Sequence, residues 1–280
     1  MTAIRMATLN AAECFGLKDR GALAPGYRAD IVLLDDLKDF HVDKVWINGE
    51  FVAEDGKYLP EIQVHDISSV KGSVIVKDFS KEKFKMNLKS NKVNVIQILP
   101  GGVVTGKATA EITLDENGEF VRNPEEDIVK VAVVERHQGT GNVACGFLKG
   151  YGIKSGAVAL SIAHDSHNII VVGVSDEEME FAVQSLIAQE GGIVLVKEGK
   201  VIESMPMPIG GLMSDQSGEW VDQKLTDIHE KAYEELGICG DVEPVMTLCF
   251  MSLAVIPEVK LTDMGLFDVT TFSFIPVEAE

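Results

Sequence analysis

The densest group of potentially reactive side chains lies in residues 161–173, which read Ser-Ile-Ala-His-Asp-Ser-His-Asn-Ile-Ile-Val-Val-Gly. Five consecutive polar residues interrupt this apolar stretch: His164, Asp165, Ser166, His167 and Asn168. Such an interruption is typical of a loop at the rim of a sheet, where rigid strands position chemistry-bearing side chains. Histidine and carboxylate groups there could bind a substrate, transfer protons or ligate a metal ion. The alternative is a polar turn whose side chains only satisfy backbone groups.

A second polar group, residues 135–142, also follows an apolar segment that resembles a strand. Its glycines lack the Gly-x-Gly-x-x-Gly spacing of a dinucleotide site. We interpret it as a loop built around Arg136 and His137, while an ordinary glycine turn with an exposed histidine remains an alternative. If this loop and residues 164–168 open at one edge of a sheet, His137, His164 and His167 could form a metal ligand set or an acid–base site.

A third segment, residues 205–215, reads Met-Pro-Met-Pro-Ile-Gly-Gly-Leu-Met-Ser-Asp. It is predicted to be a flexible loop that could line or cover a pocket through Met213, Ser214 and Asp215. Methionine in such a position more often serves packing. No nucleophile elbow, phosphate-binding loop or His-Glu-x-x-His helix occurs elsewhere.

The elements that must position these loops are mainly strands. The pattern of residues 21–65 predicts a small β module with a hairpin at Asn48-Gly49. Ahead of this module, Asn10 is expected to cap the N-terminus of a short helix. Strand patterns continue from residue 66 to 135, including the alternation of residues 84–88. Two helices follow: Ser175 and Glu178 form a capping box for the first, and the second spans about 219–236. The fold class is therefore α+β, with a small β-sandwich-like N-terminal module before a larger mixed α/β domain.

Composition excludes several classes of partner. The 280 residues carry 25 Lys and Arg against 44 Asp and Glu, a formal net charge of −19, so nucleic acid would be repelled. No apolar run is long enough to span a bilayer, and no signal peptide is apparent. The four cysteines are widely separated and are expected to be reduced core thiols. We expect a soluble, cytoplasmic protein with no nucleic-acid or membrane partner.

A family resemblance adds to this interpretation. The run from Gly21 to Asp36 resembles the segment with which amidohydrolase-superfamily enzymes leave their catalytic barrel and return to a small β-sandwich. Together with Arg136-His137, residues 161–173 and residues 207–215, it resembles the C-terminal part of bacterial adenine deaminases over nearly the whole chain. The resemblance implies hydrolysis of adenine to hypoxanthine and ammonia, a step of purine salvage, by water bound to a divalent iron or manganese ion in a (β/α)₈ barrel.

The barrel's metal ligands, which include a His-x-His pair, have no counterpart in this sequence. The resemblance then implies that residues 1–20 are the remnant of the last barrel helix and its connector. Residues 21–65 would be the small β module and residues 66–280 the C-terminal domain, with no complete TIM barrel. The isolated chain is expected to be inactive without a barrel in cis or in trans. His164 and His167 remain candidates for an accessory metal, and the alternative function is an autonomous purine-binding or oligomerisation module.

Overall fold

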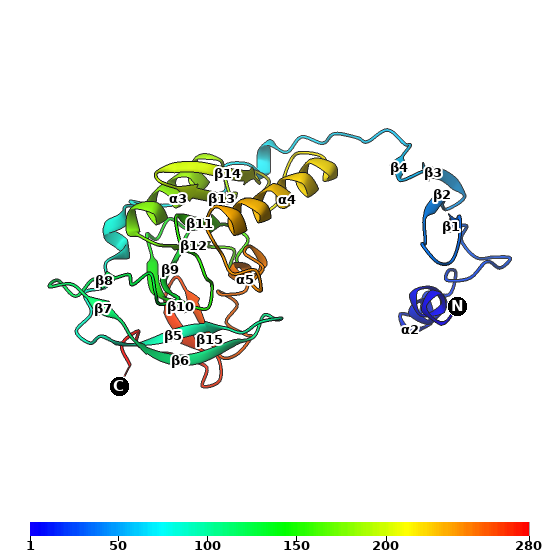
Figure 1. Cartoon of the computed structure of the whole chain (residues 1–280). Helices are drawn as coiled ribbons and strands as arrows, with labels where there is room; N and C mark the ends of the chain where they lie inside the picture. The colour runs from blue at the N-terminus through cyan, green and yellow to red at the C-terminus, as the bar shows by residue number, and fades with distance from the viewer. Residues whose placement is uncertain (280) are drawn as a thin grey trace. The chain divides into compact units, whose positions relative to one another are not determined.

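The computed structural model describes residues 1–279, and the chain divides into two compact units. The first unit is Met1–Asp66, and the second begins at Ile67. Figure 1 labels their elements. In the described residues no sheet closes into a barrel, so the predicted α+β class without a TIM barrel is confirmed. None of the helices within these residues has the length and apolar character needed to cross a bilayer.

One continuous helical segment opens the first unit. It comprises α1 (Thr2–Arg5), η1 (Met6–Asn10) and α2 (Ala11–Cys14). Asn10 lies inside this segment with helical φ and ψ of −65° and −39°, and its side chain caps nothing. The prediction of an N-cap at Asn10 is wrong, because the residues before it are already helical and supply the carbonyls that a helix start would lack.

A four-stranded antiparallel sheet completes the first unit. Its strands follow one another in the order β1 (Ile31–Leu34), β2 (Val42–Ile47), β3 (Glu50–Glu54) and β4 (Lys57–Tyr58). The predicted hairpin joins β2 to β3. Asn48 and Gly49 both have positive φ, 52° and 82°, which is the backbone that a tight two-residue turn requires.

An eight-stranded sheet dominates the second unit, in the order β14-β13-β11-β12-β9-β10-β5-β6. Neighbouring strands are antiparallel except for the parallel pair β10 and β5. The strands are β5 (Lys92–Ile98), β6 (Thr105–Glu111), β9 (Ile128–Val134), β10 (Val143–Lys149), β11 (Ala157–Leu160), β12 (Ile169–Gly173), β13 (Gly192–Lys197) and β14 (Lys200–Pro206). Two small sheets accompany them: β7 (Thr113–Leu114) with β8 (Phe120–Val121), and β15 (Val259–Thr262), β16 (Gly265–Asp268) and β17 (Ser273–Phe274).

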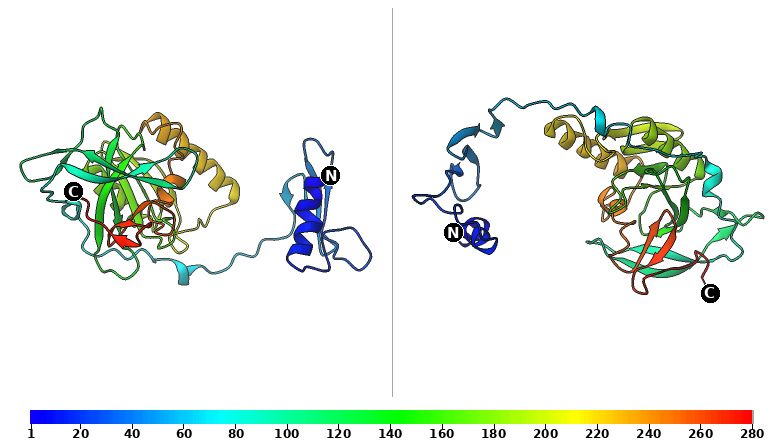
Figure 2. Two further views of the ribbon diagram at one scale, coloured as in Figure 1. Left: turned by 90° about the horizontal axis from the view of Figure 1, so that it is seen from below. Right: turned by 180° about the vertical axis from the view of Figure 1, so that it is seen from behind.

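Both faces of the central strands are covered. Helix α3 (Asp176–Ala188) packs its apolar side chains on one face. Helices α4 (Gly218–Glu234) and α5 (Met246–Cys249) and the strands β15 and β16 pack on the other. Figure 2 shows these layers from two further sides. Double coverage explains why β9, β11 and β12 are buried along their whole length and read as unbroken apolar runs.

Two local predictions for the second unit, the start of α3 at Ser175 and a strand at residues 84–88, have different outcomes. The predicted N-cap of α3 is confirmed, because Ser175 Oγ accepts from the Glu178 N–H at 3.2 Å. The Glu178 carboxylate accepts from the Gly199 N–H at 3.3 Å instead of closing the capping box. The alternation of residues 84–88 is not a strand. Phe84 is the last residue of the short helix η3 (Lys81–Phe84), and a similar short helix, η2 (Ser68–Val70), lies earlier in the chain. The backbone N–H groups of Met86 and Asn87 donate to the Glu119 carboxylate and not to a neighbouring strand. Side-chain burial therefore produced a strand-like pattern without strand pairing.

The four cysteines are free thiols. Cys249 is buried, as predicted, and Cys145 is partly buried. Cys14 and Cys239 are exposed, so the prediction of core thiols is wrong for these two. Cys14 ends the helical segment of the first unit, a unit that buries very few side chains, and Cys239 follows the end of α4. Apolar neighbours in sequence therefore did not ensure burial.

Candidate functional site

The two histidine-bearing loops meet at one edge of the large sheet. Strand β12 lies beside β9 with Ile169 opposite Val134, so the loop before β12 and the loop after β9 leave the sheet at the same edge. His137 Nε2 lies 2.7 Å from the Ser166 carbonyl oxygen. We call residues 135–142 and 161–168 the loop cluster.

Glu135 organises the first of these loops. Its buried carboxylate accepts from the backbone N–H groups of His137, Gln138 and Thr140 at 2.5, 2.7 and 2.9 Å. The Thr140 hydroxyl donates to it as well, at 3.0 Å. Burial alone would raise the pKa of Glu135, but the backbone and hydroxyl donors outweigh it and hold the pKa at about 2. Glu135 is therefore ionised and holds the turn together. The sequence placed Glu135 in a polar segment but did not indicate this role.

Arg136 is the most deeply buried charged side chain of the loop cluster and is 1% exposed. Its Nε donates to the His167 carbonyl at 2.5 Å and its Nη2 to the Gly210 carbonyl at 3.2 Å. Its backbone N–H donates to Asn168 Oδ1 at 3.3 Å, and its Nη1 is buried without a partner. Burial lowers the pKa of the guanidinium, which nevertheless stays charged at neutral pH because arginine starts so high. Arg136 thus joins loops that are 31 to 74 residues apart in sequence.

The three histidines have different surroundings. His137 is exposed, whereas His164 and His167 are partly buried, with ring centroids 5.5 Å apart. The His164 ring also packs on Phe250, at 4.9 Å. Burial lowers the pKa of His167, and the neighbouring His164 and Arg136 add to this effect. Within the same loop, Asp165 and Ser166 are exposed.

A hairpin far along the chain completes the edge. Asn168 is buried, and its Nδ2 donates to Asp263 Oδ1 at 3.2 Å. Asn142 Nδ2 donates to the other oxygen of Asp263 at 3.4 Å. Asp263 sits in the turn between β15 and β16, 95 residues after Asn168. No local signal in the sequence pointed to this carboxylate.

The segment 205–215 reaches the cluster through its backbone rather than its side chains. Ser161 Oγ donates to the Gly211 carbonyl at 2.6 Å and accepts from the Gly192 N–H at 2.7 Å. The predicted side chains serve other contacts: Met213 is 60% exposed, Ser214 Oγ accepts from Gln216, and Asp215 pairs with Lys71 at 3.1 Å. The segment therefore contacts the loop cluster through the backbone of Gly210 and Gly211, with Arg136 bound to the Gly210 carbonyl.

The donor set of the cluster does not fit a metal ion. Within residues 1–279 no three His, Cys, Asp or Glu side chains lie close enough together to hold one. His137 Nε2 is engaged by the Ser166 carbonyl, and the two closest imidazoles stand edge to face. What the cluster offers instead is imidazole, hydroxyl and carboxylate groups for hydrogen bonding to a polar ligand.

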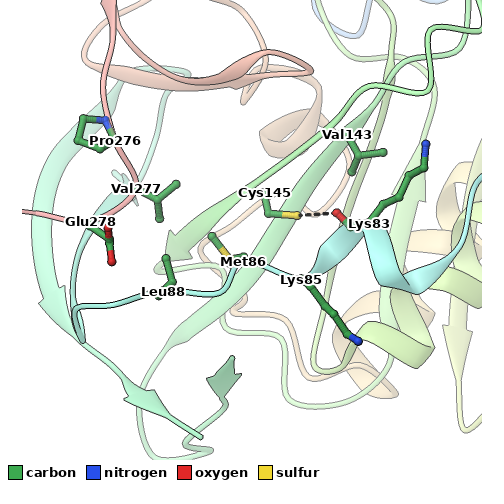
Figure 3. A pocket seen from close by; sticks show the side chains of 9 residues that line it. All are labelled: Lys83, Lys85, Met86, Leu88, Val143, Cys145, Pro276, Val277 and Glu278. Atoms are coloured by element: carbon green, nitrogen blue, oxygen red, sulfur yellow. Dashed lines mark hydrogen bonds between the residues drawn. The ribbon is translucent and has the colours of Figure 1, made fainter. Parts of the chain in front are cut away.

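A separate hollow of about 270 Å³ lies beside β10 (Figure 3). It is lined by Lys83, Lys85, Met86, Leu88, Val143, Cys145, Pro276, Val277 and Glu278. The ammonium groups of Lys83 and Lys85 point in different directions, and Lys83 Nζ donates to the Gly141 carbonyl at 2.7 Å. Burial raises the pKa of the Cys145 thiol to about 12, so it carries no thiolate at neutral pH. The hollow lacks the convergent polar groups of the loop cluster.

Comparison with known proteins identifies the family. Residues 102–273, which include the whole loop cluster, match the family described as the adenine deaminase C-terminal domain. The chain belongs to this family. Residues 1–52 also match the amidohydrolase family.

Individual relatives of this adenine deaminase C-terminal domain agree. The chain is 67% identical over 277 residues to adenine deaminase 2 of Desulfotalea psychrophila, and 49% identical over 280 residues to adenine deaminase of Ligilactobacillus salivarius. These matches cover 99% and 100% of this chain and 48% of each relative. The chain thus spans about half the length of the curated relatives it matches.

Proposed function

We propose that this chain is the C-terminal part of an adenine deaminase, which hydrolyses adenine to hypoxanthine and ammonia. The observation that carries the proposal is the 67% identity to an adenine deaminase over 99% of the chain. The loop cluster would lie at the purine site and contact the base through polar side chains. His137, His164, Asp165, Ser166, His167 and Asn168 are the candidates for this role.

The water-activating metal would be held elsewhere. Because the loop cluster does not fit a metal ion, its residues would not hold the catalytic metal. The divalent iron or manganese implied by the family would be bound by an amidohydrolase barrel, in cis or in trans. This chain would bind and orient the purine and exclude water from it. Alone, it should not turn adenine over.

The first unit supplies a surface for such a barrel. Ala12 and Val52 are its only buried apolar residues. Its helical segment and β1 line an apolar groove of about 690 Å³ that includes Ile4, Leu23 and Val32. Residues 1–52, which contain this groove, are also those that match the amidohydrolase family. We therefore assign the groove to contact with the barrel.

Reconstitution tests the proposal. The part of the Desulfotalea psychrophila enzyme that this chain does not span would be co-expressed with this chain, and ammonia release from adenine measured with added manganese or iron. We expect turnover by the pair and none by either part. Metal-dependent turnover by this chain alone would disprove the need for a barrel.

A matched pair of variants locates the contact. Val32→Asp places a charge in the groove of the first unit, whereas Val201→Asp places one at a similarly exposed apolar position on β14. Val32→Asp should weaken association with the barrel at least about 10-fold, because the charge would be desolvated in an apolar contact. Val201→Asp should leave association unchanged. Equal effects of the two variants would contradict the assigned surface.

One observation favours a second candidate, an autonomous purine-binding or oligomerisation module. The second unit has buried cores of its own and carries the whole loop cluster. Calorimetric titration of the isolated chain with adenine separates the two candidates, because a module of this kind would bind the base without a barrel. Sedimentation of the isolated chain would show whether it self-associates.

A further inference from the structure

Two adjacent glycines touch Arg136 in different ways. Gly210 and Gly211 have similar positive φ, 66° and 73°. A Cβ on Gly211 would lie 2.6 Å from Arg136 Nη1 and 2.9 Å from Cζ, whereas a Cβ on Gly210 would meet no atom within 4 Å. Gly211 is therefore required for the guanidinium to lie where it does, and Gly210 is not.

The backbone of His167 is fixed from two sides. Its N–H donates to the Ala163 carbonyl at 2.6 Å, and its own carbonyl accepts from Arg136 Nε. Its φ of 52° is in the left-handed region, which a residue other than glycine adopts only at a cost in free energy. The surrounding contacts must hold it there. Arg136 is one of these contacts, and it also holds the Gly210 carbonyl.

The ring of His167 is in a place that favours the uncharged form. Its Nδ1 is buried and has no partner. Protonation would put an N–H on both ring nitrogens and so leave a buried donor unsatisfied, which is unfavourable. It would also place a second cation near Arg136. These geometric reasons agree with the lowered pKa of His167, whose first cause is burial.

The charged groups around this ring come from two loops. On its own loop, His164 disfavours protonation of His167 and Asp165 favours it. On the loop after β9, Arg136 and His137 both disfavour it. Asp165 is exposed, so its opposing effect is screened by water. Neutral His167 is the state that these neighbours support.

We infer that Arg136 is a positioning residue: seated on Gly211, it holds the His167 carbonyl and presents the uncharged His167 ring for a hydrogen bond to the purine. The purine contact rests on the proposed function. The arrangement of Arg136, Gly211 and His167 does not, and it can be tested in this chain alone.

The first experiment follows the histidine ring signals of the isolated chain by NMR as pH is raised. His167→Gln assigns the signal, and the signals of the other histidines are followed in the same spectra. We expect His167 to titrate below an ordinary histidine. Gly211→Ala should displace the guanidinium and move the His167 midpoint upward. Gly210→Ala imposes a similar backbone strain and keeps the carbonyl that Arg136 holds, and its added Cβ would meet no atom within 4 Å, so it should leave the midpoint unchanged.

Folding of each variant is checked by near-ultraviolet circular dichroism. If Gly211→Ala does not fold, Arg136→Lys takes its place. A lysine keeps the charge but cannot donate to the His167 and Gly210 carbonyls with the fork of a guanidinium, so the midpoint should again rise. Equal midpoints for wild type, Gly210→Ala and the perturbing variant would overturn the positioning role.

The second experiment uses the reconstituted enzyme. Gly211→Ala should lower kcat/KM for adenine about 10-fold, the usual effect of disturbing a supporting contact, and Gly210→Ala less than about 2-fold. In Gly211→Ala the acid limb of the pH profile of kcat/KM should move to higher pH together with the His167 midpoint. A purely structural role of Arg136 would not move this limb. An unmoved limb would overturn the purine contact of His167. An inactive wild-type pair would overturn the proposed function itself, while the NMR result would still decide the positioning role.

Discussion

The two units of this chain differ in how they bury apolar side chains. In the second unit, three clusters of buried residues fill both faces of the eight-stranded sheet. In the first unit only Ala12 and Val52 are buried, while Phe15 and Leu23 are each 80% exposed. A unit of 66 residues that buries so little apolar surface cannot offset its chain entropy alone. The second unit therefore has the buried core of a stable scaffold, whereas the first leaves most of its apolar side chains exposed.

The largest expected effect is a difference in unfolding between the units. Each unit contains one tryptophan, Trp46 in the first and Trp220 in the second. Urea unfolding would be followed by fluorescence in Trp220→Phe and Trp46→Phe, so that each variant reports on one unit. The free energy of unfolding seen at Trp46 should be smaller by at least about 5 kcal/mol. Coincident transitions would show that the two units unfold together with the same stability.

A core substitution should have the next largest effect. Leu160 on β11 is fully buried, so Leu160→Ala should lower the free energy of unfolding of the second unit by about 2–5 kcal/mol. Leu23→Ala removes the same atoms from an exposed position of the first unit and should change the free energy by less than about 0.5 kcal/mol. Urea titration of both variants measures the contrast. A similar loss in the two would show that the first unit has a core of its own.

The smallest expected effect is that of a substitution in a loop of the second unit, at Glu135. Glu135 has a pKa of about 2, against an ordinary 4.5, so its contribution is present above pH 4.5 and is lost as pH falls toward 2. Glu135→Gln should lower stability by on the order of 2 kcal/mol at pH 7 and by roughly half of that at pH 3, where part of the contribution has been lost. Urea unfolding at the two pH values measures this, with the exposed Glu116→Gln as control. A loss that does not depend on pH would mean that the charge of Glu135 is not what holds the turn.

Local features of the fold were predictable from neighbouring residues. The turn at Asn48-Gly49 depends on backbone that these two residue types adopt readily, and the start of α3 depends on one side-chain bond from Ser175. The N-cap prediction at Asn10 was wrong, because a side chain caps a helix only where the residues before it are not helical. Residues 84–88 failed because their alternation records burial rather than pairing.

The polar interruptions of apolar runs were visible in the amino-acid order, and they marked residues 135–142 and 164–168 as loops. The sequence also carried the family resemblance. Only the tertiary structure placed β12 beside β9, brought Asp263 to Asn168 and seated Arg136 on Gly211. The physical reason is that a turn or a cap depends on residues within a few positions, whereas strand order and buried side-chain contacts depend on how distant segments pack together.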